Sequence, residues 1–366
     1  MSQSPNTSPK LPWKCRFLMN YVAYLVDMCR RPDFTVNRRL YKLFDFKSSP
    51  SKTPINGVTT SDIMVDASRN LWFRLFTPEN GSGSDVSLPV IVYFHGGGFS
   101  FLSADSFPLD RLCKRFAREL HAVIVSVNYR LAPEHRFPCQ QEDGIDVLNF
   151  IDTTNIEGFP ACANFKHCFI AGDSAGGSLA HQVTLGAIQN NFQKVKIIGL
   201  LAIQPLLGGE ERTESEIRLH KSTLMPMERT DWMWKAFLPE GSNRDHPAAN
   251  VFGPNAIDIS GLNFPATVVI VGGLDTLQDW QKRYYEGLKK SGKEAYKIEY
   301  PNAVHSFYGH PELPESSMLI EELADLVEDT PLVSLFEDMA IYSKLGCGRG
   351  RCRREKDDGD EEADPP

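Results

Sequence analysis

Residues 171–177 read AGDSAGG, and the segments on either side of this stretch decide the fold. The apolar run 168–171 before it has the composition of a buried strand, and residues 178–189 after it have the pattern of a helix. G-x-S-x-G between a strand and a helix is typical of a sharp turn that lifts a serine Oγ clear of a sheet. The flanking glycines avoid collisions with neighbouring backbone, and the helix N-terminus favours a developing anion. We therefore expect Ser174 to be a nucleophile.

Strand and helix patterns alternate on both sides of this turn. Apolar, β-branched runs predict strands at 71–76, 89–94, 122–127, 168–171, 196–203, 266–271 and 295–300. Amphipathic segments predict helices at 109–120, 141–151, 178–189 and 278–291. Strands that alternate with helices predict the α/β class, with a mostly parallel central sheet and helices on both of its faces.

A second glycine-rich motif, His95-Gly96-Gly97-Gly98-Phe99, follows the predicted strand at 89–94. Consecutive glycines let backbone N–H groups converge on one point, where they would meet the oxyanion of a tetrahedral intermediate together with the N–H of Ala175. A phosphate-binding loop is the rival interpretation, but neither G-x-x-x-x-G-K-[ST] nor G-x-G-x-x-G is completed here. We expect His95 and Gly96 to support this loop.

A serine nucleophile needs a base and a carboxylate that orients the base. Asp275 follows the predicted strand at 266–271. This position suits a catalytic residue, because the sites of mostly parallel sheets lie at the carboxyl ends of the strands. Asp279 is the alternative carboxylate, although its position one helical turn later suits a helix N-terminus. His305 lies in a loop after the last predicted strand and is the predicted base, with His310 as the alternative.

Composition and charge exclude several function classes. The chain has 366 residues, of which 42% are hydrophobic and 23% charged, as in ordinary globular proteins. Its formal net charge of -8 gives no positive field for a polyanion, so no nucleic-acid partner is expected. The eight cysteines include no C-x-x-C pair, which favours reduced thiols and a cytoplasmic location, with a nuclear location also compatible. No metal-ligand spacing such as H-E-x-x-H occurs, so neither a metal nor an organic cofactor is expected.

The two ends of the chain and one insertion depart from the alternation. Residues 1–12 are polar, and residues 329–366 end in a basic run followed by an acidic run, so both are expected to be disordered or weakly ordered. We expect one domain over 13–328. Within it, 13–46 has a helical pattern with a break near Arg31, and 210–254 is a long polar insertion between two strands.

A membrane-spanning segment is not expected. The apolar stretch that begins at Phe17 is interrupted by Asn20 and Asp27 and covers only about 13 residues, whereas a bilayer needs roughly 20. An amphipathic helix that packs on the body of the protein is the better interpretation. Stable membrane insertion is therefore not predicted, and the oligomeric state stays open.

The motifs together resemble a known family. HGGGF, VNYRLAPEHRFP (127–138), GDSAGGS, GLDTLQD and HSF resemble the hormone-sensitive-lipase group of α/β-hydrolases, and within it the plant carboxylesterases close to the gibberellin receptors. The resemblance implies an α/β-hydrolase fold and a carboxylesterase that acts on small to medium acyl esters through Ser174, His305 and Asp275. It also implies oxyanion donors at Gly97, Gly98 and Ala175, and a helical cap built from 13–46 and 210–254.

The resemblance also supplies the alternatives and one structural expectation. A non-catalytic gibberellin-type receptor would lack the triad histidine and carry serine at the third glycine, whereas this chain has His305 and Gly98. A dehydratase of the isoflavonoid type would need a threonine in the oxyanion loop, and none is present. Arg130 and Glu134 of the YRLAPE segment are expected to form a buried pair beneath the site.

Overall fold

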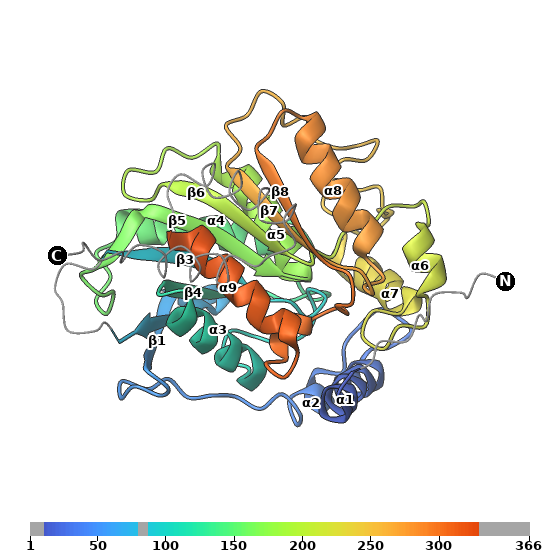
Figure 1. Ribbon diagram of the computed structural model, residues 1–366, viewed down its shortest axis with the longest axis horizontal. Coiled ribbons are helices and arrows are strands. Elements are labelled where there is room, and N and C mark those ends of the chain that lie inside the picture. Colours follow the sequence, from blue (N-terminus) through green and yellow to red (C-terminus); the bar gives the residue numbers. More distant parts are fainter. Residues whose placement is uncertain (1–10, 80–86, 329–366) are drawn as a thin grey trace, which may run out of the picture.

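A central sheet organises the computed structural model, which describes residues 11–79 and 87–328. Its strands are β1 (Val58–Asp66), β2 (Leu71–Pro78), β3 (Leu88–Phe94), β4 (Val123–Asn128), β5 (Ala163–Asp173), β6 (Ile197–Ile203), β7 (Ala266–Gly272) and β8 (Ala295–Tyr300). They form one eight-stranded sheet in the order β1-β2-β4-β3-β5-β6-β7-β8 (Figure 1). The pairs β1–β2 and β2–β4 are antiparallel, and every later pair is parallel. The predicted mostly parallel sheet is confirmed.

Helices cover both faces of the sheet, as the sequence predicts. The helices are α1 (Trp13–Cys29), α2 (Arg38–Tyr41), α3 (Phe107–Glu119), α4 (Cys139–Thr153), α5 (Ala175–Ala187), α6 (Glu214–Arg218), α7 (Met227–Phe237), α8 (Gln278–Lys290) and α9 (Pro314–Glu328), with 3₁₀ turns η1 (Ala67–Arg69) and η2 (Phe307–Gly309). Alternate side chains of β3 show the two layers. Val90 and Val92 belong to the core that holds α4, α5 and α8, whereas Ile91 and Tyr93 belong to the core that holds α3 and α9.

The antiparallel edge strand β1 has no counterpart among the predicted strands. Its sequence VTTSDIMVD places polar residues at most positions, and several of its side chains stay partly exposed along the pairing with β2. An edge strand with one solvent-exposed face lacks the continuous apolar run of a buried strand.

The N-terminal segment is less helical than its sequence pattern predicts. Helix α1 ends at Cys29, and an isolated bridge between Arg30 and Val36 follows it. Only the four-residue α2 comes after that bridge, with the Asn37 side chain accepting a hydrogen bond from the N–H of Leu40. The turn between the two helices contains Pro32, which disfavours a continuous helix.

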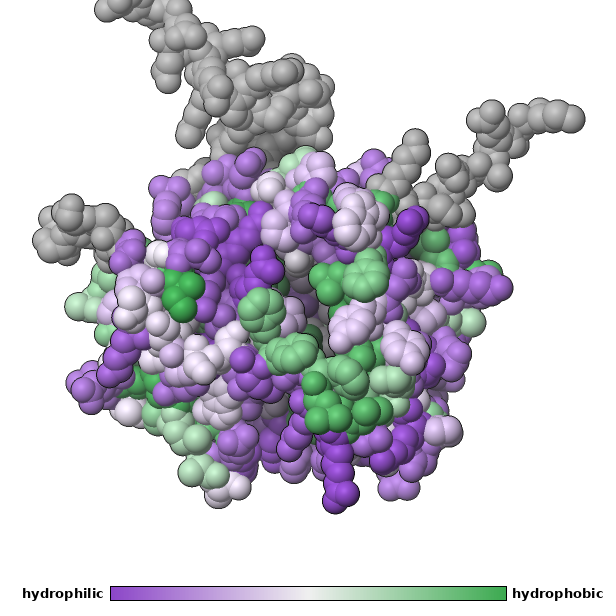
Figure 2. Space-filling model, turned by 90° about the horizontal axis from the view of Figure 1, so that it is seen from below, coloured by the Kyte–Doolittle hydropathy of each residue, from purple (hydrophilic) through white to green (hydrophobic). Residues whose placement is uncertain are grey.

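Helix α1 buries one side and exposes an apolar opposite side. Cys15, Met19 and Ala23 are buried, whereas Trp13 and Phe17 have more than half of their surface exposed. Figure 2 looks at the side of the molecule that carries α1 in Figure 1, and hydrophobic side chains gather there.

Within the described ranges, no helix is both long and apolar enough to cross a membrane. None of the six cysteines that the structure describes forms a disulfide. The expectations for residues 1–12 and 329–366 fall almost entirely outside the described chain.

Candidate active site

Ser174, Asp275 and His305 come together at the carboxyl edge of the sheet, as the sequence predicts. They follow β5, β7 and β8, and β5 to β8 are neighbours in the sheet. The Nε2 atom of His305 lies 2.9 Å from the Oγ of Ser174, and its Nδ1 atom lies 2.8 Å from Oδ2 of Asp275. All three residues are buried. This chain of hydrogen bonds is the geometry in which a histidine can take a proton from a serine.

The turn at Ser174 has the strained backbone that the G-x-S-x-G motif predicts. Ser174 has φ 53° and ψ −119°, and α5 begins at the next residue. A Cβ atom on Gly176 would lie 1.9 Å from the carbonyl oxygen of Phe94, and one on Gly172 would lie 2.2 Å from that of Gly176. The glycines are therefore needed for the close approach of the turn to β3.

The Asp275 carboxylate is held by hydrogen bonds besides that to His305. Its Oδ2 atom accepts from the side-chain amides of Gln204, at 3.0 Å, and Gln281, at 2.9 Å, while Oδ1 accepts from the N–H of Leu277. Gln204 also accepts a hydrogen bond from the N–H of Ser306, next to His305. Gln204 thus ties the carboxylate to the histidine loop, and this is a role that no motif in the sequence indicates.

A buried carboxylate anchors the glycine loop after β3. The Oδ1 atom of Asp173 accepts from the N–H of Gly96 at 2.8 Å and from the hydroxyl of Tyr93, and its Oδ2 atom accepts from the hydroxyl of Tyr308 at 2.6 Å. Burial raises the pKa of Asp173, while these hydrogen bonds lower it. The G-x-S-x-G pattern assigns no role to Asp173, although this residue adjoins Ser174 in the same motif.

The expected oxyanion donors have free N–H groups. Gly97 and Gly98 adopt φ of 101° and 61°, in the region that favours glycine. Across residues 11–79 and 87–328, the N–H groups of Gly97, Gly98 and Ala175 have no hydrogen-bond acceptor. Ala175 is the first residue of α5, where the N–H groups lack a partner within the helix.

His95 packs against the same loop. Its Nδ1 atom lies 2.8 Å from the carbonyl oxygen of Gly96, and its ring stacks on Tyr129 at 4.4 Å between centroids. Burial lowers the pKa of His95 to about 4, so the ring is neutral near pH 7. These contacts fit the supporting role expected for His95.

The two alternative site residues lie elsewhere. Asp279 is in the first turn of α8, where its carboxylate accepts from the N–H of Ser215 at 2.8 Å. His310 is buried beside Cys15 and Glu312. Neither residue takes part in the hydrogen bonds between Ser174, His305 and Asp275.

The expected buried pair between Arg130 and Glu134 is wrong. Arg130 instead pairs with Asp143 of α4, with 2.9 Å between Nη2 and Oδ1. Glu134 pairs with Arg38 of α2 at 2.6 Å, and about half of its side chain is exposed. The cause is tertiary, because the N-terminal segment brings Arg38 to Glu134 and α4 brings Asp143 to Arg130.

Helix α7 of the insertion packs directly on the glycine loop. A Cβ atom on Gly98 would lie 2.5 Å from the Cε of Met233, and the ring of Phe99 stacks on Phe237 at 3.7 Å between centroids. The N-terminal segment packs on α7 in turn, since Arg229 binds Asp27 at 2.7 Å. The two predicted cap segments are therefore in contact with each other and with the loop.

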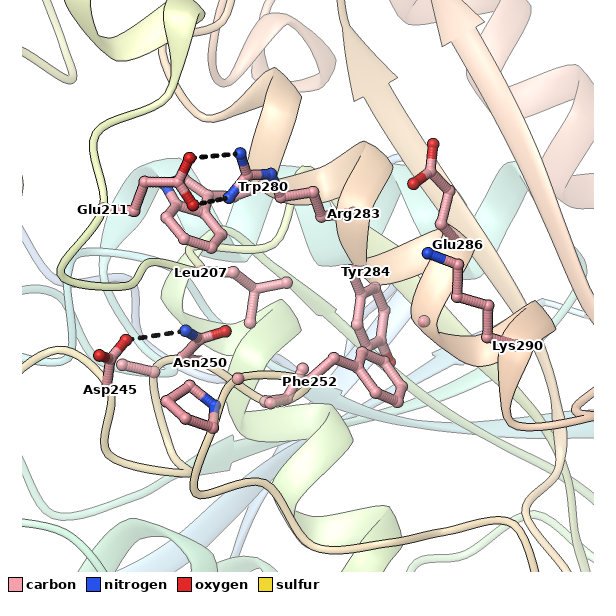
Figure 3. Close-up of a pocket in the computed structure, with 15 residues that line it drawn as sticks. Leu207, Glu211, Asp245, Asn250, Phe252, Trp280, Arg283, Tyr284, Glu286 and Lys290 are labelled. Atoms are coloured by element: carbon pink, nitrogen blue, oxygen red, sulfur yellow. Dashed lines mark hydrogen bonds and ion pairs between the residues drawn. The ribbon is translucent and has the colours of Figure 1, made fainter.

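A separate pocket of about 580 Å³ lies between residues 245–254 and α8 (Figure 3). Leu207, Phe252 and Tyr284 contribute apolar surface to it, while Glu211 and Arg283 form an ion pair with two hydrogen bonds at its edge. None of the three predicted catalytic residues lines this pocket.

Comparisons with known proteins agree with this fold and arrangement. Residues 91–309 match a family model described as the alpha/beta hydrolase fold. The chain is 39% identical over 328 residues to the gibberellin receptor GID1C of Arabidopsis thaliana, covering 87% of this chain and 94% of the receptor. It is 36% identical over 281 residues to carboxylesterase 20 of the same plant, covering 74% and 86%. A hyperthermophilic esterase of Pyrobaculum calidifontis superposes with a TM-score of 0.68 at 25% identity, covering 88% of this chain and 98% of the esterase. The chain therefore belongs to the α/β-hydrolase family, in the hormone-sensitive-lipase-like group that includes plant carboxylesterases and gibberellin receptors.

Proposed function

We propose that the protein is a carboxylesterase that hydrolyses small to medium acyl esters, with Ser174 as its nucleophile. The observation that carries the proposal is the continuous hydrogen-bond chain from Ser174 through His305 to Asp275. A serine used only to bind a ligand needs no such base. Similarity to plant carboxylesterases and to an archaeal esterase supports the same reaction class.

In the first step, Ser174 Oγ attacks the ester carbonyl carbon while Nε2 of neutral His305 accepts the hydroxyl proton. Asp275 fixes the proton on Nδ1 of His305 and stabilises the imidazolium that forms. The imidazolium then gives its proton to the leaving alcohol as the carbon–oxygen bond breaks. Water, activated by the same histidine, attacks the acyl-enzyme, and the acid leaves as Ser174 recovers its proton.

The oxyanion of each tetrahedral intermediate accepts hydrogen bonds from Gly97, Gly98 and Ala175. Three observations support these donors: their N–H groups have no acceptor in the described chain, two of them belong to the glycine loop that Asp173 holds at Gly96, and the third begins α5. Such donors stabilise charge that develops only in the transition state, and each is worth roughly 10²- to 10³-fold in kcat.

A gibberellin-type receptor is the second candidate, and the similarity to GID1C over 87% of this chain favours it. The two functions differ in what Ser174 does. In an esterase it becomes acylated, whereas in a receptor it only contacts the ligand. His305 at hydrogen-bond distance from Ser174 favours the esterase.

Hydrolysis of p-nitrophenyl esters of increasing acyl length, measured beside calorimetric binding of a gibberellin, separates the two candidates. We expect turnover of the shorter esters, and a loss of roughly 10⁴- to 10⁶-fold in Ser174→Ala. Ser317→Ala, on the exposed side of α9, is the matched control and should keep full activity. No turnover together with micromolar gibberellin binding would establish the receptor and overturn the esterase.

A further inference from the structure

A group of three metal-ligating side chains lies outside the proposed active site. Cys15, in the first turn of α1, lies beside His310 and Glu312, in the turn that precedes α9. Their ligand atoms all lie within 4.8 Å of one another. Cys15 and His310 are buried and Glu312 is exposed, so the site would be closed on one side and open to solvent on the other.

From this cluster we infer a zinc site that fastens α1 to the loop of the proposed catalytic histidine. The thiolate, imidazole and carboxylate are all ligands that Zn²⁺ takes in proteins, and a thiolate disfavours Mg²⁺ and Ca²⁺. Three protein ligands leave the fourth position of the tetrahedron to water, which the exposed side can supply.

The positions of the ligand atoms suit such an ion. With Zn–S near 2.3 Å and Zn–O near 2.1 Å, a tetrahedral ion separates sulfur and oxygen by about 3.6 Å. The Sγ of Cys15 lies 3.8 Å from Oε2 of Glu312, where the thiol donates a hydrogen bond. The ion would replace the thiol proton, which leaves to solvent, and small side-chain rotations would bring the three ligands to its coordination distances.

The backbone of the turn holds two of the ligands in place before any ion binds. Pro311 lies between His310 and Glu312, and the N–H of Leu313 donates to the carbonyl of His310 at 2.9 Å. Pro314 then starts α9. Because proline fixes φ, this turn loses little conformational freedom when it coordinates an ion.

The same turn leads directly to the proposed active site. His310 follows the 3₁₀ turn η2, which carries Tyr308, and the hydroxyl of Tyr308 donates to Asp173 at 2.6 Å. An ion at this site would therefore join α1 to the segment that follows His305. Tyr308 of that segment contacts Asp173, which anchors the glycine loop. The expected consequence of the ion is a more rigidly attached N-terminal helix.

Titration of the chelator-treated full chain with Co²⁺, a spectroscopic substitute for Zn²⁺, tests the site. We expect one equivalent to bind with a thiolate-to-cobalt charge-transfer band in the near ultraviolet, and Zn²⁺ to displace it. Cys15→Ser should remove the band. His310→Asn keeps the thiol but removes a direct ligand. It should weaken Co²⁺ binding by more than roughly tenfold, which is the lower end of what loss of a residue that only hydrogen-bonds a ligand costs.

Two controls exclude other thiols. Cys139→Ser changes a partly exposed thiol outside the cluster, and a variant with Cys347→Ser and Cys352→Ser removes both thiols beyond the described residues. Both should keep the band. A band that is absent in the wild type, that survives Cys15→Ser, or that is lost in a control would overturn the proposal.

Limited proteolysis gives a readout that does not depend on activity. Zn²⁺ should slow cleavage within α1 of the wild type and have no effect on Cys15→Ser. Equal cleavage of the wild type with and without Zn²⁺ would show that no ion fastens α1, and would overturn the inference while leaving the esterase proposal untouched.

Discussion

At the scale of single residues, Asp173 shows how an anchor beside the nucleophile can shape the oxyanion site. It accepts hydrogen bonds from Gly96, Tyr93 and Tyr308 and touches no reacting group, so its effect on rate must pass through the loop. Asn at this position would replace one accepting oxygen with an NH₂ group, which would face a group that also donates. The glycine loop would then lose part of the hydrogen bonding that anchors it.

Asp173→Asn should lower kcat by roughly 10- to 10³-fold and change KM little, because the oxyanion donors act mainly in the transition state. Steady-state kinetics with a p-nitrophenyl ester measure both constants. Tyr308→Phe removes one of the three donors and should give a smaller loss of kcat. An Asp173→Asn protein with a lower Tm but unchanged kcat would mean that Asp173 only stabilises the fold.

At the scale of elements, the contact between α1 and α7 joins the two segments of the proposed cap. Arg229 of α7 is buried and binds Asp27 of α1 together with the carbonyl oxygens of Thr223 and Leu224. Met in its place would keep much of the apolar volume but leave the carbonyl oxygens of Thr223 and Leu224 without this donor. Helices α1 and α7 would then be held together mainly by apolar contacts.

Arg229→Met should cost about 1–3 kcal/mol of stability and make α1 more sensitive to protease. It should also reduce selectivity among longer acyl esters while turnover of the acetate persists, since the residues at the sheet edge stay in place. Arg218→Met is the control, because its ion pair with Glu214 is exposed and worth little. Unchanged selectivity in Arg229→Met would show that this contact does not influence the choice among acyl chains.

Elements whose stability comes from tertiary pairing were harder to predict than those with a continuous pattern. Continuous apolar runs in the sequence indicate the buried strands β3, β6 and β7. Their predicted bounds differ from the observed ones by one residue at most. Strand β1 was not predicted, because its side chains are half exposed and its partner β2 supplies the pairing. The pattern of 13–46 predicts helix on both sides of the break near Arg31, yet α2 has only four residues, and its Tyr41 hydroxyl accepts a hydrogen bond from the N–H of Leu102.

At the scale of the whole molecule, two buried histidines, His95 and His181, make stability depend on pH. Burial lowers the pKa of both His95 and His181 to about 4, from about 6.5 in an unfolded chain. Between these values the unfolded chain binds protons that the folded protein does not. The free energy of unfolding therefore falls as the pH is lowered from about 6.5 toward 4.

His181→Gln isolates one of these contributions. His181 lies among Phe252, Phe264 and Tyr284, whose hydroxyl is 2.9 Å from its Nδ1, and Gln can keep that hydrogen bond. The variant should lose up to about 1.4 kcal/mol per pH unit of the wild-type slope between pH 4.5 and 6. Urea denaturation at several pH values measures the slope, and identical slopes would refute this assignment. Asp173, whose pKa burial raises, contributes with the opposite sign in both proteins.

The site was predictable where chemistry coincides with a local motif. Ser174, Asp275 and His305 each follow a recognisable strand, and the parallel sheet brings such positions to one edge. Gln204 was not predictable, because its contact with Asp275 joins residues that are 71 positions apart. Cys15 and Glu312 are 297 positions apart, so no local metal-ligand spacing in the sequence indicates that they meet.

Covalent labelling shows whether Ser174 is the nucleophile of an esterase. The full chain is incubated with a p-nitrophenyl alkylphosphonate, which mimics the tetrahedral intermediate, and its intact mass and peptides are measured. We predict one phosphonyl group per chain, located on Ser174, with none on Ser174→Ala and much slower labelling of His305→Gln. A wild-type chain that stays unlabelled, or that carries the group on another residue, would contradict the account of Ser174 as an esterase nucleophile.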